Sequence, residues 1–155
     1  MPNYTQYFDE IMRPLGMSSA DLVKGCPECS GPSNWPEDRA IIYAYLVIAI
    51  YGLTNVVGEP PKITSGYRCA PCNERRGGAK RSRHLAGTSG GADYGAVDIQ
   101  WGPGKIGILL DNLTEIPAFV RAVTGLDVGV GVIAYKGSRR LHLDLRASDY
   151  VSDQR

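Results

Sequence analysis

The chain has 155 residues and a mass of 16.8 kDa, the size of one domain rather than two. Its 17 Lys and Arg against 16 Asp and Glu leave a formal net charge of +1, which excludes a globally basic nucleic-acid-binding protein and an acidic disordered tail. The 19 Gly and 10 Pro predict a loop-rich fold, whereas the hydrophobic fraction of 43% excludes disorder. We therefore expect a single domain over residues 1–155.

Residues 1–35 are predicted to be a helical extension that precedes the core. Apolar residues at helical spacing over 3–13 predict a short amphipathic helix, and residues 18–24 predict a second one that ends at a glycine. Residues 25–36 have the composition of turns and contain a pair of cysteines. The start of the chain has no basic stretch followed by an apolar one, so we expect synthesis in the cytoplasm without a signal peptide.

Residues 40–57 form an uncharged apolar stretch, which has two interpretations. It is at the short end of the length that crosses a bilayer. A helix that is apolar nearly all round is also typical of the centre of a soluble core, and this one contains three Tyr, a Gly, a Thr and an Asn. We favour the core helix, with Asn34 as its cap and Pro36 as an early helical residue, and expect no membrane span.

The segments beyond this helix are mostly strands. We expect strands at 62–65, 95–100, 128–135 and 141–145, a long functional loop at 69–95, and a helix at 105–124 that Pro117 interrupts. Helices followed by strands, with one helix between them, indicate an α+β fold with a small antiparallel sheet packed against the central helix. Residues 36–146 would form this core.

The chain has only two histidines, and both lie in distinctive surroundings. His84 lies in a glycine-bounded loop, and His142 lies in a strand whose alternation places Asp144 and Arg146 on the same face. Asp98 ends a further apolar strand. Two imidazoles and one carboxylate are ligands of the type that catalytic zinc uses. Spacing alone leaves an alternative, in which each histidine is an ordinary hydrogen-bonded polar residue.

Several short motifs occur in one order along the chain: ITSGYR at 63–68, Asn73, GG at 77–78, SRHLAG at 82–87, GAVDI at 95–99, GVGV at 129–132 and LHLDLR at 141–146. In this order they resemble the zinc D-Ala-D-Ala carboxypeptidase family, and the resemblance covers about residues 40–146. That family shares its fold with the Hedgehog signalling domain and includes phage endolysins that cut the peptide stem of peptidoglycan.

The resemblance implies that His84, Asp98 and His142 bind one catalytic zinc ion. His84 and Asp98 are farther apart than is usual in the family, as if a segment rich in Gly, Thr and Ser had been inserted between them. Asp93 is nearer to His84 along the chain and is therefore the alternative ligand. Asp98 is favoured because it has the strand context of the family motif.

The resemblance also assigns the substrate side of the site. It implies that Tyr67 and Arg68 face the substrate, and a planar guanidinium suits a peptide carboxylate or carbonyl oxygen. Ser82 is expected either to bond near the zinc or substrate or to orient its own loop. Many family members have an acidic base three residues before the second histidine, where this chain has Arg139. Asp144 then acts either as the base or as a hydrogen-bond partner of a zinc ligand.

Four cysteines form two Cys-x-x-Cys pairs, and this spacing is typical of zinc knuckles. We expect a structural zinc held by Cys26, Cys29, Cys69 and Cys72, with disulfides or uncombined thiols as the alternatives. The gap between the pairs is longer than in a usual zinc ribbon. Such a zinc would connect the N-terminal segment to the substrate-binding loop.

A basic stretch follows the second cysteine pair. It consists of Arg75, Arg76, Lys80, Arg81 and Arg83, and it has two interpretations. It attracts an anionic polymer, such as the cell wall or nucleic acid, or it is simply a solvated loop. No aromatic residue stands between these charges, so a surface that stacks nucleic-acid bases is poorly supported.

These features together predict a zinc peptidase that hydrolyses stem or cross-link bonds of peptidoglycan, of the endolysin or D-Ala-D-Ala carboxypeptidase type. We expect it to come from a phage or a bacterium and to act at the cell wall or within a phage particle. The alternative is a non-catalytic metal-binding module of the same fold, such as a virion component. A nucleic-acid-binding zinc protein is the weakest of the three interpretations.

Overall fold

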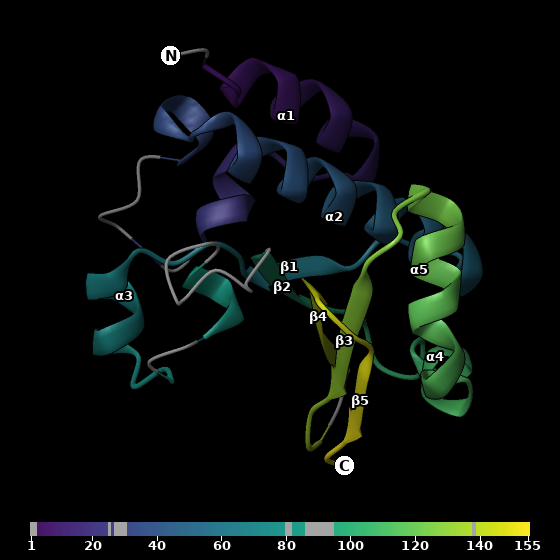
Figure 1. Ribbon diagram of the computed structural model, residues 1–155. Coiled ribbons are helices and arrows are strands. Elements are labelled where there is room, and N and C mark those ends of the chain that lie inside the picture. The colour runs from purple at the N-terminus through teal and green to yellow at the C-terminus, as the bar shows by residue number, and fades with distance from the viewer. Residues whose placement is uncertain (1–2, 25, 27–30, 80–81, 86–94, 138) are drawn as a thin grey trace.

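Figure 1 shows the computed structural model, which describes residues 3–24, 26, 31–79, 82–85, 95–137 and 139–155. The described chain is an α+β fold, as predicted, in which a sheet is packed against helices. The helices are α1 (Thr5–Met12), α2 (Glu37–Val57), α3 (Ala70–Arg75), α4 (Gly107–Asp111) and α5 (Ile116–Thr124). The strands are β1 (Lys62–Ser65), β2 (Gly95–Gln100), β3 (Gly129–Ala134), β4 (Arg140–Arg146) and β5 (Tyr150–Asp153). Short 3-10 helices are η1 (Arg13–Leu15), η2 (Ser19–Val23), η3 (Gly31–Asn34), η4 (Arg83–Leu85) and η5 (Leu113–Glu115).

The five strands form one sheet in the order β1-β2-β4-β3-β5. The pairs among β1 to β4 are antiparallel, whereas β5 runs parallel to β3. The sheet is therefore mixed, and the expectation of a purely antiparallel sheet needs this correction. The sequence did not indicate β5 because it is a short edge strand with a partly exposed surface and no buried apolar alternation.

Helix α2 is the buried core helix that the sequence predicted. It is long and apolar enough to cross a bilayer by length and composition alone, but it packs inside the fold and buries Tyr43, Leu46 and Ile50 completely. The helix begins two residues later than a cap at Asn34 implies, because Pro36 is extended and precedes the first turn, and Asn34 belongs to η3.

Two other segments differ from the prediction in their helices. The predicted loop at 69–95 contains α3 and η4 within its described part. The predicted helix at 105–124 is divided into α4, η5 and α5, and Pro117 lies in the first turn of α5 rather than at its break. A proline suits that position because the first helical turn needs no amide donor there.

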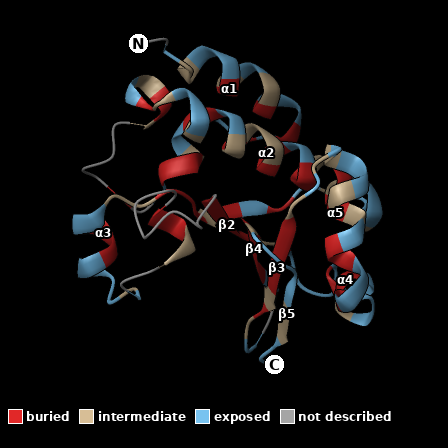
Figure 2. Ribbon diagram, in the orientation of Figure 1, coloured by how far each residue is buried: buried red, intermediate tan, exposed pale blue. Residues whose placement is uncertain are grey.

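The core lies between the sheet and the helices above it, as the buried residues in Figure 2 show. Alternate residues of the central strands face this core, among them Val97, Ile99 and Leu143. An aromatic cluster attaches the N-terminal segment to α2: Phe8, Trp35, Tyr43 and Tyr67. Each of these side chains buries a large apolar area, so the cluster fixes the start of the chain against the core.

The strand register places the polar residues on the opposite face of the sheet. Asp98 of β2 lies directly opposite His142 of β4, and Ser65 of β1 lies opposite Asp98. Because side chains alternate along a strand, the residues that face away from the core form one polar row across three strands. This row carries the candidate site.

Candidate active site

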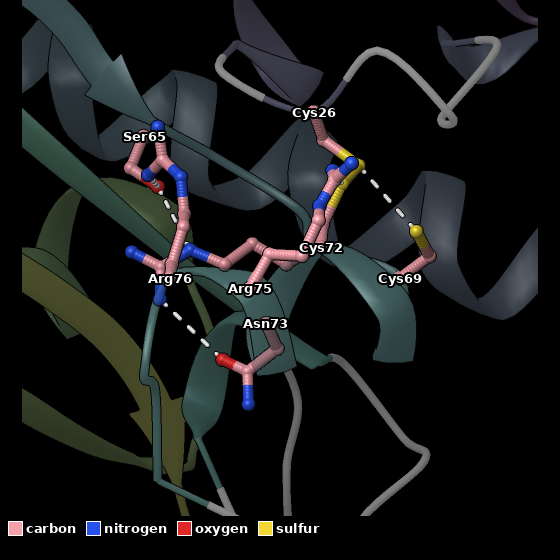
Figure 3. The surroundings of a disulfide bond; sticks show 8 residues. Cys26, Ser65, Cys69, Cys72, Asn73, Arg75 and Arg76 are labelled. Atoms are coloured by element: carbon pink, nitrogen blue, oxygen red, sulfur yellow. Dashed lines mark hydrogen bonds between the residues drawn. A yellow bond between two sulfur atoms is a disulfide. The ribbon is translucent and has the colours of Figure 1, made fainter.

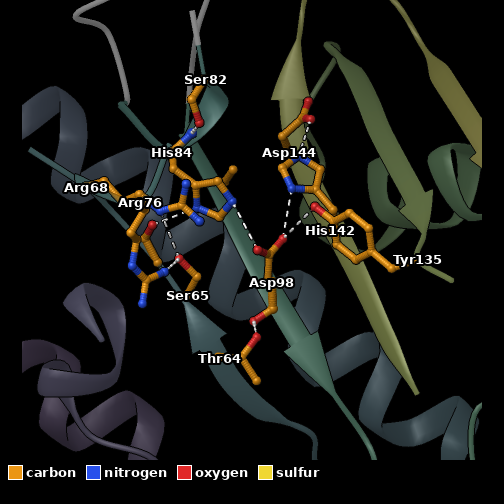
Figure 4. A network of polar contacts seen from close by, with 12 residues as sticks. Thr64, Ser65, Arg68, Arg76, Ser82, His84, Asp98, Tyr135, His142 and Asp144 are labelled. Atoms are coloured by element: carbon orange, nitrogen blue, oxygen red, sulfur yellow. Dashed lines mark hydrogen bonds and ion pairs between the residues drawn. The ribbon is translucent and has the colours of Figure 1, made fainter. Parts of the chain in front are cut away.

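His84, Asp98 and His142 meet at the centre of this polar row (Figure 4). One oxygen of the Asp98 carboxylate lies 3.3 Å from His84 Nε2, and the other lies 2.9 Å from His142 Nδ1. One donor atom from each residue lies within 4.8 Å of the others. All three side chains are buried, so the structure brings together the three ligands that the resemblance implied.

His84 is oriented by the backbone of the Ser-Gly-Tyr-Arg segment. Its Nδ1 donates a hydrogen bond of 2.7 Å to the carbonyl oxygen of Gly66, which leaves Nε2 facing Asp98. The Arg68 amide donates in turn to the His84 carbonyl at 2.8 Å. A Cβ on Gly66 would lie only 2.1 Å from the carbonyl oxygen of Leu22, so this close packing requires glycine.

His142 is held from its other nitrogen by Asp144. The Nε2 of His142 donates to Asp144 Oδ2 at 2.7 Å, so the two carboxylates lie at opposite nitrogens of one imidazole. Asp144 is fully buried, and Arg146 donates two hydrogen bonds to it, from Nε at 2.7 Å and from Nη2. Gly131 lies opposite Asp144 on β3, and a Cβ there would come within 2.5 Å of this ion pair.

This geometry favours the second of the two roles that the sequence left open for Asp144. A metal-binding histidine usually gives its other N–H to a carboxylate, which fixes the tautomer and the ring orientation. Asp144 occupies that place, and both of its oxygens are already bonded. We therefore treat Asp144 as a positioning residue for His142.

The charges of the site reinforce one another. Burial disfavours the ionised form of Asp98, but hydrogen bonds from His142 and His84 outweigh it and hold the pKa of Asp98 well below its usual value. Burial likewise opposes protonation of His142, but Asp144 and Asp98 raise the pKa of His142 to about 9. Burial also opposes ionisation of Asp144, whereas Arg146 and His142 lower its pKa to about 2.

A cluster of polar side chains lies beside the triad and includes Arg68. Arg68 Nε donates to Ser65 Oγ at 3.2 Å, and Arg76 Nη1 donates to the same oxygen at 3.2 Å (Figure 4). Asn73 on α3 accepts from Arg68 Nη1 at 3.4 Å and donates to the Ala79 carbonyl. Burial lowers the pKa of Arg68, while the charge of Asp98 opposes this effect. Arg68 thus lies beside the group of His84, Asp98 and His142, and its contact with substrate stays a prediction.

The other predicted substrate residues have different surroundings. The Tyr67 ring is buried between Trp35, at 5.7 Å between centroids, and the Arg39 guanidinium, at 4.1 Å. Ser82 Oγ accepts from the His84 amide at 3.3 Å, which corresponds to the loop-orienting role. Their contact with substrate stays a prediction. Asp93, the alternative ligand, lies outside the described residues.

The sequence assigned no site role to Ser65 or Tyr135, and it placed Arg76 only in the basic stretch. The Tyr135 hydroxyl donates to Asp98 Oδ1 at 3.4 Å, and its ring meets the His142 ring edge to face at 6.3 Å between centroids. Ile133 lies opposite His142, so the two-residue period along β3 places Tyr135 on the same face. Strand alternation was therefore a usable signal for Tyr135, whereas Arg76 comes from another element and had no such signal.

Cys26, Cys69 and Cys72 gather beside α3 (Figure 3). Cys26 and Cys72 form a disulfide, and Cys69 Sγ lies 3.4 Å from Cys26 Sγ. The structure thus differs from the expected four-thiolate zinc site in showing a disulfide and a group of three cysteines. Cys29 lies outside the described residues. Of the predicted basic stretch, Arg75 at the end of α3 and Arg76 just after it are exposed, and Lys80 and Arg81 also lie outside the described residues.

The donor set of the triad fits zinc. Two imidazole nitrogens and one carboxylate oxygen, each fixed by a neighbour, are the three protein ligands of a catalytic zinc site that keeps one position open. Such a site on an α+β fold defines a zinc hydrolase. Comparison with protein families matches residues 24–144 to Peptidase M15, and the chain therefore belongs to this family of zinc metallopeptidases. Comparison with curated proteins and with solved structures finds no match.

Zinc uptake should displace a proton from His142. The pKa of His142 is raised to about 9, so at pH 8 the metal-free protein carries a proton that zinc binding at Nδ1 must remove. We expect release of about one proton per chain at pH 8, and an apparent zinc affinity that falls as the pH drops below 9. Calorimetric zinc titrations of the oxidised protein, in buffers with different ionisation enthalpies, measure this release. A binding enthalpy independent of the buffer would contradict it.

Proposed function

We propose that the protein is a zinc-dependent peptidase that hydrolyses peptide bonds in the stem or the cross-links of bacterial peptidoglycan. The observation that supports this most is the buried group of His84, Asp98 and His142, whose donor atoms lie within 4.8 Å of one another. M15 peptidases act on peptidoglycan peptides, so membership of the family supports the substrate class. Arg68 beside the triad supplies a cation of the kind that such a peptide requires.

The chain's own residues hold and orient the proposed metal. His84 Nε2, Asp98 and His142 Nδ1 would bind it, because the Gly66 carbonyl and the Asp144 carboxylate occupy the remaining imidazole nitrogens. A zinc ion bound there would supply Lewis-acid polarisation of the scissile carbonyl and an activated water. We also propose that the protein excludes bulk water from these three side chains, all of which are buried.

Arg68 is proposed to bind the substrate at a carboxylate or carbonyl oxygen. Its guanidinium is half-buried and held from two sides, by Ser65 and Asn73. A side chain that is already ordered loses little entropy when it binds a ligand. Arg76 adds a second cation at Ser65, so the pair favours an anionic group of the peptide.

Arg68→Lys should lower kcat/KM about 10- to 100-fold. A hydrogen bond to a charged group contributes about 1.5–3 kcal/mol, and lysine does not reproduce the planar fork. Steady-state kinetics on a soluble stem peptide measure this change. Arg13→Lys is the matched control, since Arg13 is exposed in η1 and distant in sequence from the site. Equal kinetics for wild type and Arg68→Lys would contradict a substrate role for Arg68.

The function is tested on purified peptidoglycan with the zinc-loaded protein. We expect new amino groups to appear, and a chelator or the His142→Ala substitution to abolish them. Mass analysis of the products then assigns the bond: free alanine indicates a carboxypeptidase, and separated stem peptides indicate an endopeptidase. If the zinc-loaded protein releases no amino groups from any cell-wall type, the peptidase proposal fails, and the non-catalytic module of the same fold takes its place.

We further propose that this activity takes place at the cell wall, in a bacterium or as part of a phage lytic system. The proposed substrate supports this location, since peptidoglycan occurs only there. The association with a phage particle is tested by probing purified virions and lysates of the producing strain with an antibody. Detection in lysates but not in virions would support a free lysin and exclude a virion component.

A further inference from the structure

The cysteine cluster is a second group of possible metal ligands that the peptidase site does not use. Cys26 follows η2 in the N-terminal segment, whereas Cys69 and Cys72 stand at the start of α3. Their three sulfur atoms lie within 4.8 Å of one another, although the two segments are far apart in the sequence (Figure 3). Cys26 and Cys72 are buried and Cys69 is partly buried.

We propose that these three cysteines form a thiolate centre that binds one Zn²⁺ ion when reduced, and that the Cys26–Cys72 disulfide is its oxidised, metal-free form. Sulfur atoms bound to one tetrahedral zinc at about 2.3 Å lie about 3.8 Å apart. Cys69 Sγ lies 3.4 Å from Cys26 Sγ, close to this spacing, and reduction of the Cys26–Cys72 bond would let those two sulfurs separate to the same spacing.

The local structure places the cysteines close enough to share a metal ion and puts a positive charge beside them. Cys69 and Cys72 are three positions apart at the first turn of α3, so their side chains lie on one face. Arg75 Nη2 donates to Cys72 Sγ at 3.2 Å. A guanidinium beside a sulfur stabilises the thiolate, which is the form that binds metal. It also offsets the negative charge that three thiolates leave on a divalent ion.

The two forms interconvert by a balanced reaction. A dithiol reductant gives two electrons and two protons to the Cys26–Cys72 disulfide, and the reductant itself becomes a disulfide. The three thiols then bind Zn²⁺ and release their protons to solvent. The metal would connect the same two segments that the disulfide connects, so the N-terminal segment stays attached to α3 in both forms.

The centre is tested in a background that lacks the proposed peptidase ligands. The double variant His84→Ala/His142→Ala removes two of those ligands, so any tightly bound zinc reports the cysteines. We expect the reduced double variant to retain about one zinc per chain after dialysis and the oxidised form to retain none, by elemental analysis. Reduced protein with its thiols intact and no bound zinc would overturn the proposal.

Cysteine substitutions in this background identify the ligands. Cys69→Ser should abolish zinc retention, whereas Ala70→Ser, which places the same side chain one position away on an exposed part of α3, should not. Cys29→Ser tests whether the other cysteine of the first sequence pair completes the site. Zinc retained in full by Cys69→Ser would overturn the three-cysteine centre.

Cobalt provides a measurement that does not depend on a cysteine variant folding. Co²⁺ bound to thiolates has an intense sulfur-to-metal charge-transfer band in the near ultraviolet. We expect this band when Co²⁺ is added to the reduced double variant, and its loss when excess Zn²⁺ displaces the cobalt. Stoichiometric cobalt binding without the band would overturn the proposal. None of these readouts requires peptidase activity, so the two proposals fail independently.

Discussion

Asp98→Asn should abolish zinc binding and lower peptidase activity by about three orders of magnitude or more. Asp98 bridges the two imidazoles, with one oxygen toward each ring. An amide presents one oxygen and one N–H group in the same space, so it loses the charge and one of the two acceptors. A catalytic metal contributes several kcal/mol to the transition state, and each 1.36 kcal/mol is tenfold in rate. Zinc content and release of amino groups from peptidoglycan measure the two effects.

Asp111→Asn is the matched control for this substitution. Asp111 is exposed at the end of α4, so the same change of charge there should alter neither zinc content nor rate. Circular dichroism should show that both variants are folded. Full activity of Asp98→Asn would show that Asp98 is not a ligand, and Asp93, the alternative from the sequence, would then be the next residue to substitute.

The metal triad could be predicted because its members carry strong local signals. The chain contains only two histidines, and strand alternation places His142 and Asp144 on one face. Asp98 lies within an apolar strand, and the antiparallel register brings it opposite His142. For these residues, the two-residue alternation of a strand and the family motifs were enough to predict that they lie together.

The surroundings of the triad could not be predicted in the same way. Arg76 and Asn73 reach the site from α3, in a segment that looked like a loop because Gly, Arg and Ser dominate it. The distance of Cys26 from Cys69 depends on how the N-terminal segment packs against Trp35 and the core, which no local pattern records. Contacts between distant segments depend on tertiary packing, which overrides local propensity.

The role of Asp144 shows where alternation alone is insufficient. The pattern placed Asp144 on the face of His142, and this fits a base as well as a positioning residue. The contacts in the structure favour the positioning role, since Asp144 bonds Nε2 while Asp98 faces Nδ1. Strand alternation predicts the face on which a side chain lies, but it does not predict which imidazole nitrogen a carboxylate contacts.

Asp144→Asn should lower zinc affinity about 10- to 100-fold, since partners of metal ligands have effects of this size. The amide weakens the hold on His142 Nε2 and removes a charge, so the pKa of His142 in the metal-free protein should fall from about 9 toward its usual value. Zinc titration gives the affinity, and NMR titration of the two histidines gives the pKa. A general base would instead leave zinc affinity unchanged while kcat fell.

The stability effect of Asp144 should be large and depend on pH with a defined sign. Removing one partner of a buried ion pair costs about 3–5 kcal/mol, so Asp144→Ala should lower the unfolding free energy by that amount at neutral pH. The pKa of Asp144 falls from 3.8 to about 2 on folding, so its contribution is complete above pH 4 and is lost as the pH falls through 2. Denaturant unfolding of the metal-free proteins at several pH values measures the difference.

The chain supplies a matched control for this ion pair. Asp153 pairs with Arg155 at the same two-residue spacing as Asp144 with Arg146, but Asp153 is exposed, whereas Asp144 is fully buried. Exposed pairs contribute about 0–1 kcal/mol, so Asp153→Ala should change stability little. Equal losses for the two variants would mean that burial does not set the strength of the Asp144 pair. A large loss at Asp144 alone, together with the shift of the His142 pKa, would establish that one buried carboxylate stabilises the sheet and orients the metal ligand at once.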